Sequence, residues 1–350
     1  MPHRRLMERS LLAGLEERGI QLLAAVTPPE VDTAADLVLA CRAAGISVGL
    51  WPMLDDASGR WASARSMAAF VPYVEHLLTE LHRRTAMPDV LAVDLEPPIA
   101  RTRRLLGSSA GPALMEVRPH PAIGDMGGGA LVELMQQLHA LGVETITAFI
   151  PALLCDQRRI RGWGRVLETP LPEAPPGRLA AMAYTSLFEG YSGGLLRRAD
   201  ARALLGAFCA VARRRWDGRA AIALGAVGMG ALGDERVYRS PTELADDVAI
   251  ARAAGVDDIA LFDLGGALGR APAERWLDAL VHTEPAPRRP RLTPRAAAVL
   301  AALYGASPPL ELAGRWLEGR SRRSDPGTDP APRARRRETL KSVLSRSDVP

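Results

Sequence analysis

Short apolar runs recur along the chain and alternate with stretches of helical periodicity. Strands that alternate with helices in this way predict βα units and a parallel sheet. The run at residues 220–227 is almost wholly apolar, which is typical of a strand covered on both faces. Seven runs are expected to be strands, at residues 20–26, 46–54, 89–96, 143–150, 179–187, 220–227 and 258–263.

Four of the helical stretches end at a glycine that is followed at once by an apolar run. These glycines are Gly19, Gly45, Gly142 and Gly255. Glycine adopts the left-handed conformation that ends a helix at little cost, so each marks the turn from a helix into a strand. The repeated unit favours a (β/α)8 barrel of the TIM type over an open doubly wound sheet.

The chain begins with a helical stretch, Leu6 to Arg18, and only seven strands are visible. We therefore expect the first strand of the barrel to be absent from this sequence, through a late start or a truncation. Its absence would leave an open seam beside the strand at 20–26. Any secretion signal would have been lost with it. As written, the opening residues are charged and no transmembrane stretch is expected, so the chain is predicted to be cytoplasmic.

Composition divides the chain into a barrel at 1–283, a linker with a short helical appendage at 284–318, and a tail at 319–350. The appendage is expected to hold two helices, near 294–304 and 308–318. The tail contains nine Arg or Lys and four Asp or Glu, which gives it a net charge of +5. The whole chain has a net charge of +4, so the rest of the chain is close to neutral, at about −1. It is predicted to be disordered. Neither nucleic acid nor membrane is expected as a partner of the barrel, and the oligomeric state stays open.

Several chemistries are disfavoured by composition. The only lysine is Lys341, in the tail, which excludes a Schiff-base mechanism in the barrel. Cys41, Cys155 and Cys209 lie far apart, without the spacing of a disulfide framework or a zinc site. The histidines fall mostly in helices or loops. No metal and no cofactor are expected.

Active sites of such barrels lie where the strands run into the following loops. Those strand ends offer acids and aromatic residues and no histidine, which is typical of a sugar-binding site. Asp94 and Glu96 share one face of an apolar strand. Burying two acids costs several kcal/mol unless they are hydrogen-bonded, form ion pairs or take part in function. The strand-end candidates are Trp51, Asp55, Asp56, Asp94, Glu96, Pro151, Tyr184, Thr185, Gly228, Met229, Phe262 and Asp263.

The segment Asp89-x-x-Ala92-x-Asp94-x-Glu96 resembles the D-x-x-D-x-D-x-E strand motif of family 18 glycoside hydrolases, the chitinase-like group. If the missing first strand is counted, this is the fourth strand, where that family carries its motif. Likewise Met182-Ala-Tyr184 is similar to the Met-x-Tyr that the family has on its sixth strand.

The resemblance implies an enzyme that hydrolyses a sugar polymer or oligosaccharide, N-acetylated sugars included. Glu96 would be the general acid that protonates the glycosidic oxygen. Asp94 would orient and stabilise the acetamido group as its carbonyl attacks the anomeric carbon, and Tyr184 would donate a hydrogen bond to that group. Such a substrate-assisted route needs no enzyme nucleophile.

Carbohydrate is therefore the expected ligand, although the chain departs from the family pattern at three positions. Ala92 replaces an acid, Thr185 stands where an Asp is common, and Phe262 replaces a Trp. A noncatalytic carbohydrate-binding barrel stays open as an alternative. The residues expected to contact the sugar are Trp51, Asp55, Met182, Phe262 and Asp263.

Two further signals compete with this hypothesis. The glycine-rich segments 225–233 and 264–269 follow the last two strands, where many barrels bind phosphate. They predict an anion near Gly228 and Gly266 if the protein is a phosphate-binding lyase or isomerase, although the glycines can equally form tight loops. The G-x-S-x-G at 190–194 lacks the strand-turn-helix context of a serine hydrolase. Asp156 and Glu189 are expected on the rim of the cleft.

Overall fold

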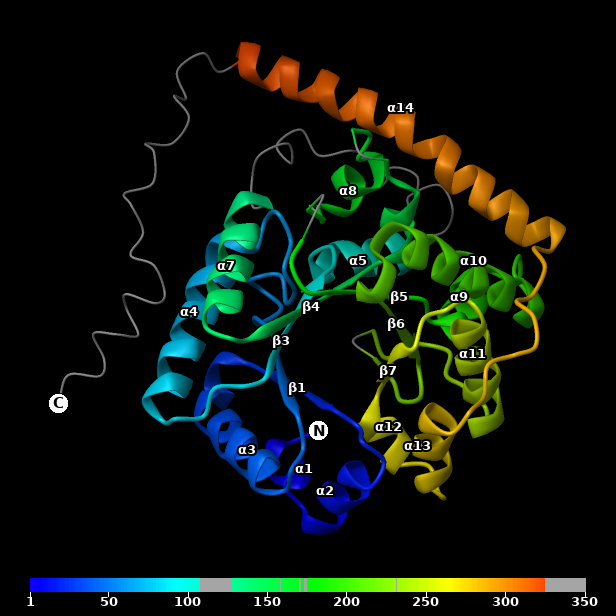
Figure 1. The fold of residues 1–350 in the computed structure, drawn as a ribbon. Helices are drawn as coiled ribbons and strands as arrows, with labels where there is room; N and C mark the ends of the chain where they lie inside the picture. Colours follow the sequence, from blue (N-terminus) through cyan, green and yellow to red (C-terminus); the bar gives the residue numbers. More distant parts are fainter. Residues whose placement is uncertain (108–127, 158, 170, 173–174, 231, 325–350) are drawn as a thin grey trace. The chain divides into compact units, whose positions relative to one another are not determined.

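The computed structural model contains seven strands in one sheet, ordered β1 to β7 as they follow one another in the sequence (Figure 1). The strand pairs β1–β2, β2–β3, β5–β6 and β6–β7 are parallel. Helices connect successive strands, so the fold is the TIM-type (β/α) arrangement that the sequence predicts. The structure describes residues 1–107, 128–157, 159–169, 171–172, 175–230 and 232–324.

All seven predicted strands are present, and only β5 begins outside its predicted range, by one residue. The four glycines expected to end helices have φ angles of +62 to +81°, which confirms the left-handed turns. The strands are β1 (Leu22–Val26), β2 (Val48–Pro52), β3 (Val90–Leu95), β4 (Glu144–Phe149), β5 (Arg178–Met182), β6 (Ala220–Gly225) and β7 (Asp258–Phe262).

The described helices lie mostly between the strands. The α-helices are α1 (His3–Leu6), α2 (Arg9–Glu16), α3 (Val31–Ala43), α4 (Met67–Arg83), α5 (Ile99–Gly107), α7 (Gly128–Ala140), α8 (Gly162–Leu167), α9 (Thr185–Tyr191), α10 (Arg198–Trp216), α11 (Pro241–Ala253), α12 (Leu264–Leu268), α13 (Glu274–Val281) and α14 (Pro294–Ser324). Three short 3-10 helices are η1 (Pro28–Glu30), η3 (Pro151–Cys155) and η4 (Asp217–Arg219).

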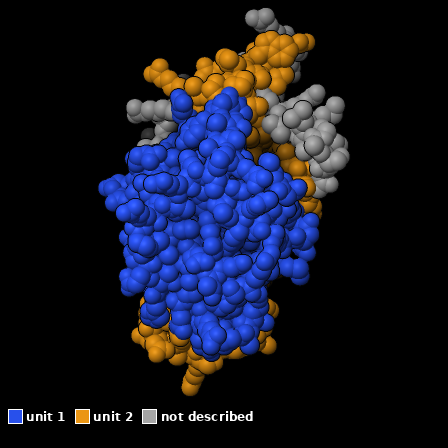
Figure 2. All heavy atoms as spheres, turned by 90° about the vertical axis from the view of Figure 1, so that its right-hand side faces the viewer, with its two compact units in different colours: residues 1, 147–157, 177–306 blue, residues 2–146, 158–176, 307–350 orange. Residues whose placement is uncertain are grey.

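Contacts divide the chain into two compact units, which Figure 2 colours separately. Unit 1 comprises Met1, Thr147–Gln157 and Gly177–Ala306, and therefore holds β5 to β7. Unit 2 comprises Pro2–Ile146, Arg158–Pro176 and Ser307–Pro350, and therefore holds β1 to β3. The strand-end candidates after β2 and β3 therefore belong to unit 2, and those after β5, β6 and β7 belong to unit 1.

The core of unit 2 forms between its strands and α3 and α4. On α4, the side chains of Phe70, Val74, Leu77 and Leu81 are fully buried, and their spacing follows the helical period. In unit 1, α10 and α11 contact β6 in the same manner. The strands are thus held from the helix side, which leaves their opposite face to carry the site.

The start of the chain packs on the first strand of unit 2. Buried His3 contacts the carbonyl oxygen of Ala25 through Nε2 at 2.7 Å and the Thr33 hydroxyl through Nδ1 at 2.9 Å. Residues 1–21 contain α1 and α2 and no strand, and β1 stands at one end of the sheet order. That a first strand precedes this sequence stays a prediction.

The end of the chain differs from the prediction, because α14 is one continuous helix rather than a pair. Pro308 and Pro309 lie inside it, and a proline normally ends or kinks a helix since it lacks the N–H. In α14 the helical turn that contains the two prolines is stabilised by hydrogen bonds from another segment of the chain. The Gly162 N–H donates to Ser307 Oγ at 3.2 Å, and Arg165 Nε donates to Glu311 at 2.9 Å. The tail predicted to be disordered lies mostly outside the described residues.

The α14 segment also has a property that the sequence analysis did not anticipate. In the part of the chain that the structure describes, Pro294–Arg320 is the one helical segment long and apolar enough to cross a membrane, judged by length and a mean hydropathy of 1.3. That criterion is met by many helices that do not span membranes. Only 22% of its most apolar window is buried inside the protein.

Candidate functional site

Two carboxyl groups meet at the carboxyl end of β3 in unit 2. Asp94 follows Ala92 on one face of the strand, and Glu96 follows Asp94 just past the strand end. The opposite face carries the core side chains, which are completely buried: Leu91, Val93 and Leu95. The alternation predicted from the sequence therefore holds, and both acids lie away from the core of unit 2.

Asp94 is buried and only partly satisfied. It is 4% exposed, and its Oδ1 has no hydrogen-bond partner among the described residues. The neighbouring carboxyl group of Glu96 interacts with it electrostatically. A buried carboxyl oxygen without a partner costs several kcal/mol, so a position like this is usually explained by a ligand or a catalytic role.

The two acids perturb each other's ionisation. Burial, together with the neighbouring charge of Glu96, raises the pKa of Asp94 well above its usual value. Burial raises the pKa of Glu96 to about 7, although the hydrogen bond from Asp94 and the charge of Arg60 oppose the increase. Both acids therefore keep their protons to a higher pH than isolated carboxyl groups do.

The loop that follows β2 brings Arg60 towards this pair. The Ala62 N–H donates to the carbonyl oxygen of Asp94 at 3.0 Å, which fixes the end of the loop to β3. Arg60 has a φ of +65° and its Nε donates to Asp56 Oδ1 at 2.7 Å. Arg103 binds the other oxygen of Asp56 at 3.2 Å. Asp56 thus holds Arg60 in place.

The two predicted sugar contacts on this loop side occupy different environments. Register pairs Leu50 with Leu91, which puts the partly exposed Trp51 beside Ala92 on the face that carries Asp94. Asp55 is exposed, and its Oδ1 accepts the Ser58 N–H at 2.6 Å in the turn of the loop. The structure gives Asp55 a turn-forming role, while its contact with a sugar stays a prediction.

A buried glutamate that the sequence analysis missed joins three loops of unit 2. The Glu168 side chain is 1% exposed and accepts hydrogen bonds from Arg65 Nε and Arg101 Nη1. Its carbonyl oxygen accepts the Ala64 N–H at 2.8 Å. These residues come from the segments after β2, β3 and β4, so Glu168 holds together the loops on the acid side of the unit. No sequence pattern distinguished it.

In unit 1, two aromatic rings stack at the strand ends. The rings of Tyr184 and Phe262 lie 5.6 Å apart with an interplanar angle of 12°. Between them in the sheet is Gly225, which pairs with Phe262. A Cβ at Gly225 would lie 3.3 Å from Tyr184 Cδ1 and 2.8 Å from the Phe262 carbonyl oxygen, so the stack requires glycine there. Tyr184 and Phe262, two of the strand-end candidates, therefore stack on each other.

The other two candidates of unit 1 lie on the same strands. Met182 pairs with Ala223 and is partly exposed, on the face that carries Tyr184. Asp263 directly follows β7 and is the N-cap of α12, where its carboxylate accepts the Gly266 N–H. This contact explains Asp263 by helix capping, and its role in sugar binding stays a prediction.

The glycines after the last two strands pack backbone against backbone. A Cβ on Gly266 would lie 2.1 Å from the nitrogen of Gly228, and a Cβ on Gly228 would lie 2.9 Å from an oxygen of Asp263. Both glycines are therefore explained by the close approach of two loops. The Asp263 carboxylate already occupies the Gly266 N–H and brings a negative charge, which disfavours phosphate at this position.

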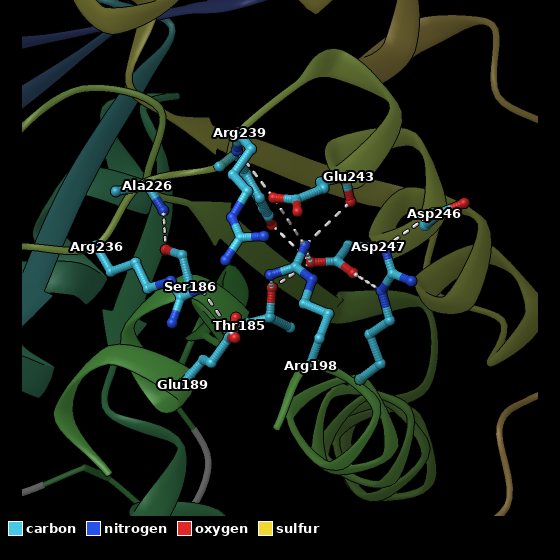
Figure 3. Close-up of polar contacts among 12 residues, drawn as sticks. Thr185, Ser186, Glu189, Arg198, Ala226, Arg236, Arg239, Glu243, Asp246 and Asp247 are labelled. Atoms are coloured by element: carbon cyan, nitrogen blue, oxygen red, sulfur yellow. Dashed lines mark hydrogen bonds and ion pairs between the residues drawn. The ribbon is translucent and has the colours of Figure 1, made fainter. Parts of the chain in front are cut away.

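A buried aspartate, Asp247, organises the polar contacts around Thr185 and Arg198 (Figure 3). The Asp247 side chain is fully buried, and burial raises its pKa. It accepts hydrogen bonds from Tyr238 Oη at 2.8 Å and from the Thr185 hydroxyl. Arg198 Nη2 and Arg202 Nε donate to it at 3.2 and 3.1 Å.

This network fixes the turn that carries Tyr184. Thr185, the next residue, is held by Asp247 and also accepts a hydrogen bond from Arg198 Nη1 at 2.9 Å. Ser186 donates to the Gly225 carbonyl oxygen at 2.9 Å and accepts the Ala226 N–H at 2.8 Å. The sequence offered one signal for Asp247, since it falls on the buried stripe of α11 with Leu244, Val248 and Ala251.

The remaining candidates have ordinary structural contacts. Ser192 Oγ donates to the Glu189 carbonyl oxygen and accepts the Leu196 N–H, both at 3.0 Å, and it follows α9 rather than opening a helix. Glu189 pairs with Arg236 at 3.0 Å. Across the described segments, no three His, Cys, Asp or Glu side chains gather as a metal site requires.

The expected site residues thus form two groups, each within one unit. Asp94, Glu96 and Trp51 belong to unit 2, whereas Tyr184 and Phe262 belong to unit 1. Each group lies at the carboxyl ends of its strands, as the barrel fold requires. That the two groups face one ligand stays a prediction.

The chain matches no protein-family model, and no curated protein is significantly similar in sequence. Among solved structures, it is similar to the PgaB (BpsB) glycoside hydrolase domain of Bordetella bronchiseptica, with 14% identity over 77% of this chain and 93% of that one and a TM-score of 0.47. A broad-specificity endoglucanase from Bacteroides salanitronis has 13% identity over 78% and 84% of the two chains and a TM-score of 0.49. An L-ribulose 3-epimerase has 15% identity over 94% and 96%, with a TM-score of 0.41. These similarities are too distant to transfer an activity.

Proposed function

We propose that this protein is a glycoside hydrolase in which Glu96 is the general acid and Asp94 orients and stabilises the reacting sugar. One observation carries the proposal. Asp94 is buried at a strand end with Oδ1 lacking a hydrogen-bond partner in the described chain, next to a glutamate whose pKa burial raises to about 7. A carboxylic acid that keeps its proton close to neutral pH is what protonation of a leaving oxygen needs.

The reaction would proceed in two balanced steps on an N-acetylated sugar. Glu96 gives its proton to the glycosidic oxygen while the acetamido carbonyl oxygen of the substrate attacks the anomeric carbon, so the glycosidic bond breaks and a cyclic intermediate forms. The Glu96 carboxylate then takes a proton from water as that water opens the intermediate. Asp94 Oδ1, which has no hydrogen-bond partner among the described residues, would accept a hydrogen bond from the acetamido N–H.

The departures from the family 18 motif bear on Asp94 directly. Where the family has an acid, this chain has Ala92, so Asp94 lacks a carboxyl neighbour on that side of the strand. Glu96 is the carboxyl neighbour whose charge raises the pKa of Asp94. This arrangement supports an acid pair that works as one unit, and it leaves the identity of the sugar and the linkage open.

The decisive experiment compares Glu96→Gln with wild type on N-acetylated and neutral oligosaccharides, with products separated by chromatography. Glu96→Gln keeps the shape of the side chain and removes the proton, so turnover is expected to fall by roughly 10²- to 10⁴-fold. Asp89→Asn is the matched control. It changes an acid at the other end of β3, where Asp89 Oδ2 accepts the Val48 N–H at 2.8 Å, and should leave turnover intact.

Equal turnover by wild type and Glu96→Gln on every cleaved substrate would remove Glu96 from the mechanism. Calorimetric binding of oligosaccharides without any product would instead indicate the noncatalytic carbohydrate-binding barrel. The phosphate-binding lyase or isomerase has less support, because Gly228, Gly266 and Asp263 are explained by loop packing and capping.

A further inference from the structure

The C-terminal half of α14 exposes an apolar stripe. Pro309, Leu312, Ala313 and Trp316 lie at positions i, i+3, i+4 and i+7 of the helix, and all four are exposed. Leu312 is 68% exposed and Trp316 is 60% exposed, although large apolar side chains usually lie inside a protein. We call these four residues the α14 apolar face.

The opposite side of the helix is fixed to unit 2. Glu311 is buried and accepts hydrogen bonds from Arg165 Nε at 2.9 Å, and Arg165 Nη1 reaches Glu318 at 2.7 Å. Gly314 packs so closely that a Cβ there would lie 2.5 Å from Arg165 Cδ. Because these contacts hold one side of the helix, α14 cannot turn to bury Leu312 and Trp316 without breaking them.

Positive charge adjoins this face. The Arg320 guanidinium lies over the Trp316 ring, 4.7 Å from its centroid. From residue 319 to 350 the chain has nine basic and four acidic residues, and this segment begins where the apolar face ends. An apolar patch with Trp beside a polybasic segment supplies the two signals that stable attachment to a membrane requires.

We propose that the α14 apolar face and the basic C-terminal segment together dock the protein on the surface of an anionic membrane. Leu312 and Trp316 would enter the interface between headgroups and acyl chains while the basic residues bind the lipid phosphates. The helix lies on the surface and does not cross the bilayer, because Arg165, Glu311 and Glu318 occupy its other side.

Two other partners explain the observations less well. A nucleic acid would bind the basic segment but would leave the α14 apolar face in water. A second copy of the chain would bring two basic segments of net charge +5 beside each other, which repel. The sequence by itself predicts no membrane partner, because the exposure of Leu312 and Trp316 is not apparent from composition.

The test is co-sedimentation of the full-length protein with phosphatidylcholine vesicles, with and without phosphatidylglycerol. Wild type should bind the anionic vesicles and be released by high salt. The double variant with Leu312→Ser and Trp316→Ser should bind the anionic vesicles about tenfold or more weakly than wild type. Removing three tail charges, with Arg335→Gln, Arg336→Gln and Arg337→Gln, should weaken it about fivefold for each charge. Leu195→Ser is the matched control, since Leu195 is 59% exposed and belongs to unit 1, whereas the α14 apolar face belongs to unit 2.

The proposal is overturned if wild type does not sediment with anionic vesicles. It is also overturned if the double variant Leu312→Ser and Trp316→Ser binds these vesicles as strongly as the Leu195→Ser control. Light scattering of the same variants adds a further readout. A dimer that dissociates with Trp316→Ser, without lipid binding, would assign the α14 apolar face to a second copy and contradict the membrane proposal. Binding of an oligonucleotide that depends on the tail alone would contradict it as well.

Discussion

The Ala62 N–H donates to the carbonyl oxygen of Asp94 at 3.0 Å, so the loop after β2 is joined to the strand that carries the acid pair. Ala62 and Asp94 lie more than thirty positions apart in the sequence. Arg60, two residues before Ala62, therefore has a fixed place beside the carboxyl groups. Its guanidinium lowers the pKa of Glu96 relative to what burial alone would give.

Arg60→Gln is expected to raise the pKa of Glu96 further. Without the positive charge, the ionised form of Glu96 loses a stabilising neighbour, so its proton is released at higher pH. Side-chain carboxyl carbon NMR of the folded protein, with Glu96→Gln to assign the signal, measures this titration directly. If the enzyme turns over a sugar, the alkaline limb of its pH–rate profile should move upwards by the same amount. Arg103→Gln serves as the control, and a signal that titrates at the same pH in both variants would contradict the role given to Arg60.

Glu96→Gln is expected to stabilise the protein at alkaline pH. An unfolded glutamate ionises near pH 4.5, whereas folded Glu96 keeps its proton to about pH 7, so the free energy of unfolding falls as pH rises between these values. The loss is on the order of 3 kcal/mol and the amide variant avoids it. Urea unfolding at pH 4 and pH 8 should show a gain for Glu96→Gln at pH 8 only. An exposed acid such as Glu16, changed to Gln, should show little effect at either pH, and the same pH dependence in wild type and Glu96→Gln would refute the raised pKa.

Asp247→Asn is expected to destabilise the protein strongly, whereas the neighbouring Asp246→Asn is not. Asp247 is fully buried against Arg198 and Arg202, and its loss would leave their charges without a buried counter-ion, which costs about 3–5 kcal/mol. Asp246 pairs with Arg202 at the surface, 49% exposed, where such a pair contributes about 1 kcal/mol or less. Thermal unfolding of the two variants measures the difference. Similar midpoints for both would show that the network around Thr185 does not stabilise the fold.

The strands were predictable because their signals are local. Glycines such as Gly142 and Gly255 mark helix ends by a conformation that other residues adopt at a cost, and the apolar runs after them indicate strands. Asp94 and Glu96 were found for the same reason, since two acids in such a run conflict with their surroundings. The alternation of side chains along one strand was sufficient to place them together.

The contacts between distant segments were not predictable in this way. Glu168 binds two arginines that lie 103 and 67 positions earlier in the chain, and no spacing indicates such a meeting. The continuity of α14 across Pro308 was missed because the contacts that stabilise it come from Gly162 and Arg165. Asp263 and the glycines near it were assigned to ligand binding, yet their local contacts explain them as a helix cap and a close approach of two loops.

The contact between Gly228 and Gly266 links two positions that are far apart in the sequence. Neither can accept even a methyl group while the other keeps its place, so a change at one is tolerated only if the other loop moves. Related chains should therefore retain or lose these glycines together. This paired behaviour gives a way to identify distant relatives when overall identity has fallen too low to do so.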